Sequence, residues 1–530
     1  MADFISHYIL SILIFFPLVA AGVIFLIPSK ETSQVHRNIA MIAVVVEFIL
    51  SLHLIRYFFS GSSFFQFAQF IPWLPKVTGV NYIVGVDGLS LSLVLLSTTF
   101  CMFGVMTSYT TIKVRSKAFL ILFLMLESTI IGVFTSLDVV LFYVFWEASL
   151  IPVYFMIGIW GGKQRIHATL KFFIYGVAGS LLMLVALIYL YYVHGKGTGI
   201  YSSNILDLYS TAANLPFPVQ SWLFLAVTLS FGIKVPIFPF YSWLPDAYEQ
   251  SPAIYTIMSG VILKLAAYGL IRFSVCLFPQ AASHYATAIM ILAVIGILYG
   301  ALIAWQQTNI RRIMAFSSLS HLGFIVLGIF AFNQFSLQGA LYQMLNHAIT
   351  AGALFILFNF LYERRKSFDI NDFGGLASTM PWFSLFFIIA CMGAVALPST
   401  GSFVGEWLIL MGAFQAAPII ASIATLGVIL GAVYILWIAY KVIFGTAKYS
   451  ENVHVVKLRN YEVFQLVVLS GFIFVLGFAA TPIMEHTQTT LLRIEKTAIQ
   501  KISYESRLVQ SVHGRLVPIQ LSSDAAQGDK

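Results

Sequence analysis

Charged residues are scarce in this sequence. Asp, Glu, Lys and Arg make up only 9% of its 530 residues, whereas hydrophobic residues make up 59%. A soluble domain has about 25% charged residues, so the composition excludes a protein that folds mainly in water. The few charged residues therefore become the main candidates for function.

Motifs for cofactors, metals and nucleic acids are also missing. The sequence has no phosphate-binding loop, no dinucleotide-binding glycine pattern and no obvious pair of haem ligands, so we expect no cofactor in this chain. Cys101, Cys276 and Cys391 stand singly in hydrophobic stretches, which indicates packing rather than a metal or redox site. The net charge of +8 forms no basic stripe, and no nucleic-acid partner is expected.

Long hydrophobic runs dominate instead, and they predict an all-α integral membrane protein. Each run is long enough to cross a hydrocarbon core of about 30 Å, whereas barrel strands would be shorter and would alternate in polarity. The pattern predicts about fourteen transmembrane helices. They cover approximately 8–28, 38–59, 84–109, 117–135, 138–160, 169–194, 220–243, 252–275, 284–305, 311–332, 338–362, 382–415, 420–445 and 461–482.

The distribution of Lys and Arg in short loops predicts the orientation. Most of them follow the odd-numbered spans, and the opposite loops hold only Arg56, Lys76, Lys196 and Arg272. Basic loops stay in the cytoplasm, so both termini are expected on the outer, periplasmic side of an inner (plasma) membrane. The loop after the seventh span, with acidic Asp246 and Glu249, is an exception.

Two spans contain helix-breaking residues at similar positions. The seventh reads FGIKVPIFPFYSWLP and the twelfth ALPSTGSFVGEW. A proline inside a helix frees a backbone carbonyl, which is tolerated at membrane depth only where protein or water covers it. Each break therefore predicts local water. Paired broken helices are also typical of ion transporters built from inverted repeats.

These patterns predict five regions. They are the first three helices (1–116), a five-helix proton half-channel repeat (117–275), a second, inverted five-helix repeat (284–445), the last transmembrane helix (446–482) and a polar C-terminal tail (483–530). In the tail, Arg493, Glu495 and Lys496 suggest an amphipathic surface helix. The composition predicts a disordered end from about Ser511.

Six ionisable residues inside predicted spans are the main candidates, because a charge there costs about 2.5–3.5 kcal/mol. They are Glu147, Lys234, Lys264, His321, His347 and Glu406. A structural reading would make Glu147 and Lys234 a fixed ion pair and the histidines ordinary core residues. Glu47, Asp87 and Glu127 are equally open to a packing or subunit-contact role.

The functional reading is proton transfer. Burial disfavours the charged form of a side chain, and an opposite charge nearby restores it. Lys234 would load a proton when Glu147 approaches and release it when Glu147 withdraws. Lys264 and His321 could pass that proton through water to Glu406.

Five motifs around these residues resemble a known family. FWEASLIPVYFMIGIWGG, IKVPIFPFYSWLPDA, AFSSLSHLGF, NHAITAGALF and ALPSTGSFVGEW follow the order and spacing of the antiporter-like subunits of respiratory complex I. The resemblance covers about residues 80–450. It implies a proton-translocating membrane-arm subunit of a NADH:quinone oxidoreductase, with NADH, FMN, iron–sulfur clusters and quinone in partner subunits.

Within that family the chain looks most like the subunit M (subunit 4) type. Glu406 is an acid where the L and N types typically carry Lys, and no long lateral helix follows the last span. The resemblance implies a switching pair of Glu147 and Lys234, a central relay at Lys264, a link through His321 and His347, and a terminal donor at Glu406. It also implies L-type and N-type neighbours in the bilayer.

The sequence also departs from the family's pattern. Tyr248 replaces a common His, so we assign its loop no proton-uptake role, and Ala348 replaces a common Gly. The alternatives are a subunit of a multisubunit cation/proton antiporter, a membrane-bound hydrogenase subunit and a purely structural spacer.

Overall fold

The computed structural model describes residues 2–28, 34–62, 64–445, 456–500, 509–512 and 515–518. The first half of the chain contains α1 (Ala2–Leu26), α2 (Gln34–Tyr57), β1 (Gln66–Pro72), η1 (Lys76–Thr78), β2 (Asn81–Val86), α3 (Gly88–Thr111), α4 (Ser116–Thr135), α5 (Val139–Ala148), α6 (Leu150–Trp160), α7 (Arg165–Thr198), α8 (Ile205–Ala213), α9 (Phe217–Lys234), α10 (Trp243–Gln250), α11 (Ala253–Gly269) and η2 (Leu270–Val275).

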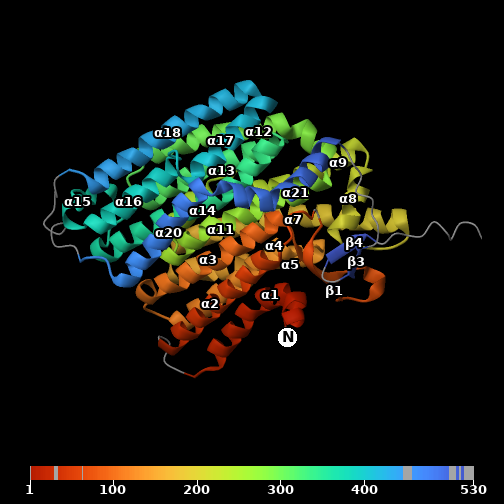
Figure 1. Ribbon diagram of the computed structural model, residues 1–530, viewed down its shortest axis with the longest axis horizontal. Coiled ribbons are helices and arrows are strands. Elements are labelled where there is room, and N and C mark those ends of the chain that lie inside the picture. The colour runs from red at the N-terminus through yellow and green to blue at the C-terminus, as the bar shows by residue number, and fades with distance from the viewer. Residues whose placement is uncertain are drawn as a thin grey trace, which may run out of the picture.

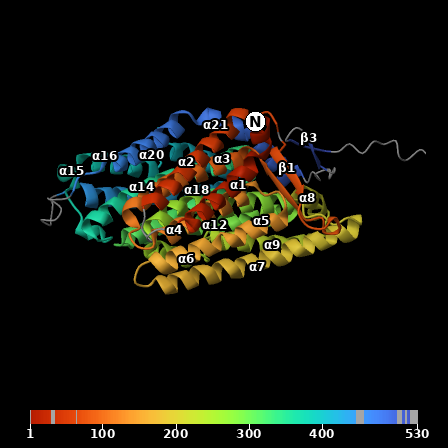
Figure 2. The ribbon, with the colours of Figure 1, turned by 90° about the horizontal axis from the view of Figure 1, so that it is seen from below.

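The second half contains α12 (Pro279–Gln306), α13 (Ile310–Phe330), α14 (Gln334–Arg365), η3 (Ile370–Asp372), α15 (Leu376–Thr379), α16 (Pro381–Ala394), α17 (Gly401–Ala416), α18 (Pro418–Ile443), α20 (Asn460–Phe478), α21 (Ala480–Gln500), β3 (Val509–Val512) and β4 (Arg515–Pro518). Most long helices lie side by side in one elongated bundle (Figure 1). The helix α7 follows an outer edge of it (Figure 2), and α13 and α14 are buried along nearly their whole length.

The all-α membrane fold predicted from hydropathy is confirmed. In the described part of the chain, 12 helices are long and apolar enough to cross a membrane, with α5 and α6 counted together. The predicted spans 252–275 and 382–415 correspond to α11 with η2 and to α16 with α17, which are individually shorter. The count of fourteen spans stays a prediction.

Both predicted helix breaks are present. The first lies between the end of α9 at Lys234 and the start of α10, and the second lies between α16 and α17. Pro236 in the first break has a φ of 26°, and Ala396 and Ser399 in the second have φ of 58° and 87°. Non-glycine residues rarely adopt such angles. Strained backbone of this kind clusters at functional sites, which directs attention to the side chains beside the breaks.

The C-terminal region is folded further than the sequence predicted. The amphipathic helix is confirmed as α21, which packs on α3, α12 and α14. The prediction of a disordered end from about Ser511 is wrong for 511–512 and 515–518, which belong to β3 and β4 in a sheet of order β2-β1-β4-β3. The prediction failed because β4 pairs with β1, which is remote in sequence, while β3 pairs with β4. Residues 519–530 lie outside the described part.

Arg272 is not a loop residue, which corrects the loop assignment made from the sequence. It lies in the π-helical segment η2, and its guanidinium donates to the Asp87 carboxylate at 2.6 Å with both side chains 1% exposed. Arg493 of α21 contacts the same carboxylate at 3.3 Å. Asp87 also caps the N-terminus of α3. This triad fastens α3, η2 and α21 together.

The acidic loop after the seventh predicted span forms α10, and ion pairs account for its composition. Asp246 accepts from Lys171 of α7 at 2.7 Å, and Glu249 accepts from Arg312 of α13 at 2.8 Å. The acids of α10 therefore neutralise basic residues of neighbouring elements. This explains why a loop on the basic side of the protein contributes no Lys or Arg.

We expect Arg272→Gln to lower the free energy of unfolding by about 3–5 kcal/mol, because it leaves the buried Asp87 carboxylate without its closest cation. Arg312→Gln is the matched control. Its side chain is 34% exposed, and such pairs contribute about 0–1 kcal/mol. Thermal denaturation of the purified full-length protein measures both, and equal losses of stability would contradict the assigned role of Arg272.

Candidate functional site

Four of the six predicted site residues lie in one buried line across four helices. The Nζ of Lys264 (α11) is 2.5 Å from Nδ1 of His347 (α14). The rings of His347 and His321 (α13) have centroids 5.5 Å apart. The Nδ1 of His321 is 3.0 Å from Oε1 of Glu406 (α17). The line joins a base, two imidazoles and an acid, all of which can gain or lose a proton.

The helix α14 supports two positions of this line. His347 and Gln343 are four residues apart, so they lie on the same face of the helix, and the Gln343 amide donates to Glu406 Oε1 at 2.9 Å. Gly405, directly before Glu406, allows α17 to approach, because a Cβ there would lie 2.8 Å from Gln343 Oε1. Close packing of α14 and α17 thus fixes the Glu406 carboxyl.

A cavity of about 10 Å³, room for about one water molecule, adjoins Glu406 beside the second helix break. It is lined by Ser320, His321, Phe324, Ala394, Val395, Glu406, Gly427, Val428, Gly431 and Tyr434. Tyr434 and Ser317 share a hydrogen bond of 2.7 Å beside it. A space that holds water needs polar partners, and Glu406, His321 and Ser320 supply them here.

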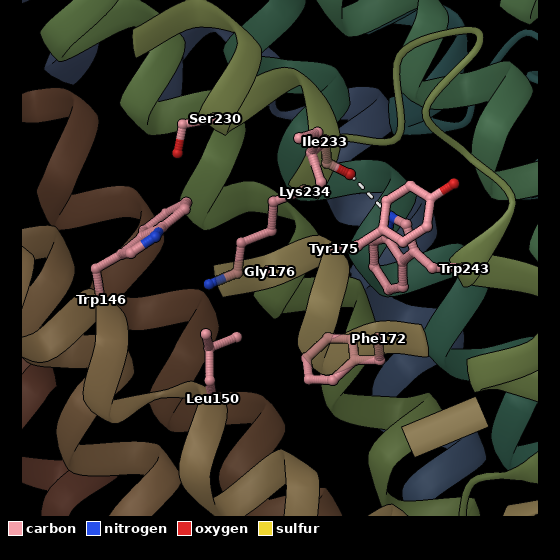
Figure 3. A pocket seen from close by; sticks show the side chains of 9 residues that line it. All are labelled: Trp146, Leu150, Phe172, Tyr175, Gly176, Ser230, Ile233, Lys234 and Trp243. Atoms are coloured by element: carbon pink, nitrogen blue, oxygen red, sulfur yellow. Dashed lines mark hydrogen bonds between the residues drawn. The ribbon is translucent and has the colours of Figure 1, made fainter. Parts of the chain in front are cut away.

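Lys234 lies beside the first break, at a second cavity of about 10 Å³. Trp146, Leu150, Phe172, Tyr175, Gly176, Ser230, Ile233, Lys234 and Trp243 line it (Figure 3). The Lys234 ammonium donates to Ser149 Oγ at 3.3 Å. It also lies 3.7 Å from the centroid of the Trp146 ring.

Glu147 and Lys234 do not form the predicted pair in this conformation. Among the described residues no ion pair joins them, and Oε1 of Glu147 has no hydrogen-bond partner. Glu147 is half-buried, whereas Lys234 is 6% exposed. If the two residues switch as the sequence suggested, this arrangement is the withdrawn one.

The two lysines are also not directly joined, since no hydrogen bond between Lys234 and Lys264 occurs in the part of the chain that the structure describes. A third cavity, of about 10 Å³, lies between the first break and α12 and α13. Its lining is apolar: Val235, Pro236, Ile237, Phe238, Leu292, Ala293, Gly296, Leu319, Leu322, Gly323 and Val326. A proton between the lysines would need intervening water.

Sequence reasoning missed the partners of these residues. Trp146, Ser149 and Gln343 contact functional candidates, and only the position of Trp146 directly before Glu147 could have drawn attention to it. Asp87 belongs to the triad with Arg272 and Arg493. Glu47 and Glu127 are fully buried, and none of their carboxylate oxygens has a hydrogen-bond partner.

The part of the chain that holds this arrangement matches a known protein family. Residues 136–431, a range that includes all six candidates, match the transmembrane model of the NADH:quinone oxidoreductase/Mrp antiporter family. The chain belongs to this family. The match begins just before α5 and ends within α18, so it spans both helix breaks.

Relatives of the family cover most of the chain. NADH-quinone oxidoreductase subunit M of Rickettsia prowazekii is 38% identical over 90% of this chain and 96% of its own length. Those of Rhodobacter capsulatus and Escherichia coli K12 are 41% and 38% identical, over 82% and 89% of this chain and 86% and 94% of their own lengths.

Solved structures of the family share the fold. A chain of respiratory complex I from Thermus thermophilus is 27% identical, with a TM-score of 0.83 over 92% of this chain and 99% of that one. A chain of the Mrp complex from Dietzia sp. DQ12-45-1b has a TM-score of 0.81, at 19% identity over 94% and 99%. At that identity, the Mrp likeness shows the fold alone.

We expect Gly431→Leu to exclude water from the Glu406 cavity. A Cβ at Gly431 meets nothing within 4 Å, and Gly431 lines this cavity, so a larger side chain there takes up the space of the water. Radiolytic hydroxyl-radical labelling of Tyr434 and His321 should fall severalfold. The matched control is Gly471→Leu, whose Cβ is equally unobstructed but lies on the exposed face of α20. Unchanged labelling in Gly431→Leu would mean that the cavity is dry.

Proposed function

We propose that this chain is the subunit M-type proton-translocating component of a NADH:quinone oxidoreductase. Quinone reduction elsewhere in the complex would drive protons across the membrane through this subunit. The observation that carries the proposal is the buried contact line from Lys264 through His347 and His321 to Glu406. A structural core has no need of four proton-exchanging side chains in sequence.

Each step of transfer along this line can be written for named atoms. The Lys264 ammonium gives a proton to Nδ1 of His347, which becomes an imidazolium. This cation releases a proton from Nε2, through water, to His321. His321 in turn gives its Nδ1 proton to Glu406, which becomes a neutral carboxylic acid. The two nitrogens of each ring let a proton enter on one side and leave on the other.

The loading step would take place at the first helix break. When the Glu147 carboxylate approaches Lys234, the opposite charge stabilises the ammonium, which binds a proton. When Glu147 withdraws, that stabilisation is lost. The lack of a Glu147–Lys234 ion pair among the described residues is consistent with the withdrawn state. Water at the breaks would connect this step to Lys264.

The energy for pumping would come from outside the chain. Moving one charge against 100 mV requires about 2.3 kcal/mol. We assign NADH, FMN, iron–sulfur clusters and quinone to partner subunits, and no redox site to this one. The enzyme is therefore the whole complex, a translocase, and this chain would lie between L-type and N-type neighbours in the inner (plasma) membrane with both termini outside.

The proposed proton path also divides the chain into the five regions predicted from the sequence. The first proton half-channel would be 117–275, which contains Glu147, Lys234 and Lys264. The inverted second unit would be 284–445, with His321, His347 and Glu406. Residues 1–116, 446–482 and the tail at 483–530 would frame them.

A cation/proton antiporter subunit is the second candidate, because the family model and the Mrp fold cover both kinds of protein. The subunit M relatives, at up to 41% identity, favour the oxidoreductase. Glu406 favours it as well, since the resemblance places a Lys at this position in the antiporters.

We expect Lys234→Ala or Glu147→Ala to lower proton pumping and coupled quinone reduction by about tenfold or more, because each removes a proton-transfer partner. Oxidation of NADH by an artificial acceptor at the peripheral arm should be unchanged. Pumping is measured with the complex in reconstituted vesicles, and Lys163→Ala, in an exposed loop, is the control. Normal pumping in both variants would refute the proposed function.

We also expect His347→Phe to lower pumping, by about tenfold or more, because it interrupts the relay. The matched control is His194→Phe. His194 is a second buried histidine, but its Nδ1 bonds Thr211 far from the relay. Equal effects of the two substitutions on pumping, at equal amounts of assembled complex, would show that His347 matters only for packing.

A further inference from the structure

The Lys234 ammonium rests on an aromatic face. Its Nζ lies 3.7 Å from the centroid of the Trp146 ring, well within the roughly 6 Å range of a cation–π contact. Figure 3 shows the ammonium pointing toward Trp146 and Leu150, away from Tyr175. Its other partner is the hydroxyl of Ser149 at 3.3 Å. Both partners are neutral, although the carboxylate-bearing Glu147 directly follows Trp146 in the sequence.

The Trp146 ring attracts the protonated form of Lys234 more strongly than the neutral form. The negative face of an indole attracts a cation, most strongly when water is excluded, but gives little to a neutral amine. Lys234 is 6% exposed and Trp146 is 2% exposed, so this contact is largely desolvated. The ring face therefore favours the protonated lysine without forming an ion pair.

Trp146 and Glu147 lie next to each other on α5, and adjacent residues of an α-helix point about 100° apart. In this structure the ammonium contacts the ring, and no ion pair with Glu147 occurs among the described residues. The two residues thus offer alternative positions to one cation, on one helix.

Few other ionisable groups compete for Lys234. On the elements packed against it, α5 presents Glu147, α7 presents Tyr175, α11 carries Lys264 and η2 carries Arg272. Lys264 is engaged with His347, and Arg272 with Asp87. On α10, Asp246 is paired with Lys171. Further groups are Tyr143 and Glu147 on α5, and His284, Tyr285 and Tyr299 on α12, which packs on α9; of these only Glu147 is a carboxylic acid.

We propose that Trp146 is a positioning residue that holds the Lys234 ammonium while Glu147 is withdrawn. The lysine would otherwise lose its proton as soon as the carboxylate left. With the ring beside it, the proton stays on Lys234 until a path toward Lys264 opens. This inference rests on the proposed function and specifies how its loading step is timed.

A packing role for Trp146 must be separated from this one. The ring stacks on Phe142 at 5.8 Å and meets Phe231 edge-on at 5.2 Å, so truncation would disturb the core. Replacements that keep the shape of the Trp146 side chain leave the core packing intact. Site-specific replacement of Trp146 by mono-, di- and trifluorinated tryptophans weakens the negative face of the ring in steps while keeping its outline.

The experiment measures coupled quinone reduction and proton pumping by the intact complex as a function of pH. Weaker attraction lets Lys234 deprotonate at a lower pH, so the alkaline limb of the profile should move to lower pH with each fluorine. For Trp146→Leu the displacement should reach about one pH unit. Trp146→Phe, which keeps an aromatic face, should restore most of it.

Trp243→Leu is the matched control. Trp243 is equally buried and lines the same cavity, but its indole N–H donates to the Ile233 carbonyl at 2.8 Å. This substitution should leave the alkaline limb in place, whatever it does to the amount of assembled complex.

The outcomes separate the two proposals. An alkaline limb that is independent of fluorination, or that moves equally in Trp146→Leu and Trp146→Phe, would overturn the role of Trp146. The proposed function would survive that result if Lys234→Ala still abolished pumping. Normal pumping in Lys234→Ala would instead remove the function on which the inference rests.

Discussion

A charge in a hydrocarbon environment requires a partner from the protein, and this requirement organises the molecule. Buried ionisable residues on one helix meet partners on another: Lys264 with His347, His321 with Glu406, Arg272 with Asp87, and Arg364 with Glu462. These contacts differ in one chemical respect. Arginine keeps its proton at any physiological pH, whereas lysine, histidine and glutamate exchange theirs. The arginine pairs therefore stay charged and hold helices together, whereas the other contacts can pass protons.

The two helix breaks use this chemistry differently. At the first break a lysine faces aromatic and aliphatic side chains, with neutral hydroxyl and indole groups as its partners. At the second, a glutamate faces a histidine, a glutamine amide and a cavity with a tyrosine and a serine. The lysine at the first break is thus held mainly by an aromatic face, whereas the glutamate at the second is held by hydrogen bonds.

Much of this could be predicted from the sequence, because membrane insertion makes strict demands on single segments. Hydropathy located the helices, proline and glycine located the breaks, and intramembrane charge identified Lys264, His321, His347 and Glu406, which do lie in contact. The direction of Lys234 could not be predicted, since the choice between Trp146 and Glu147 depends on how α5 and α9 are rotated. Arg272 was misplaced because loop charge rules consider position along the chain and not burial. The strand β4 pairs with β1, which is distant in sequence, and β3 is attached to the sheet only through β4.

The helix α21 connects elements from different parts of the bundle, which limits how these parts can move. It lies across α3, α12 and α14, and its Arg493 shares a buried carboxylate with Arg272 at the end of the lysine-bearing α11–η2 segment. Rocking of one half of the bundle against the other, as in many transporters, would have to break the contacts of α21 with α3, α12 and α14 and the contact of Arg493 with Asp87. Motion of side chains and water inside the bundle leaves these contacts intact, so it costs less than motion of whole helices.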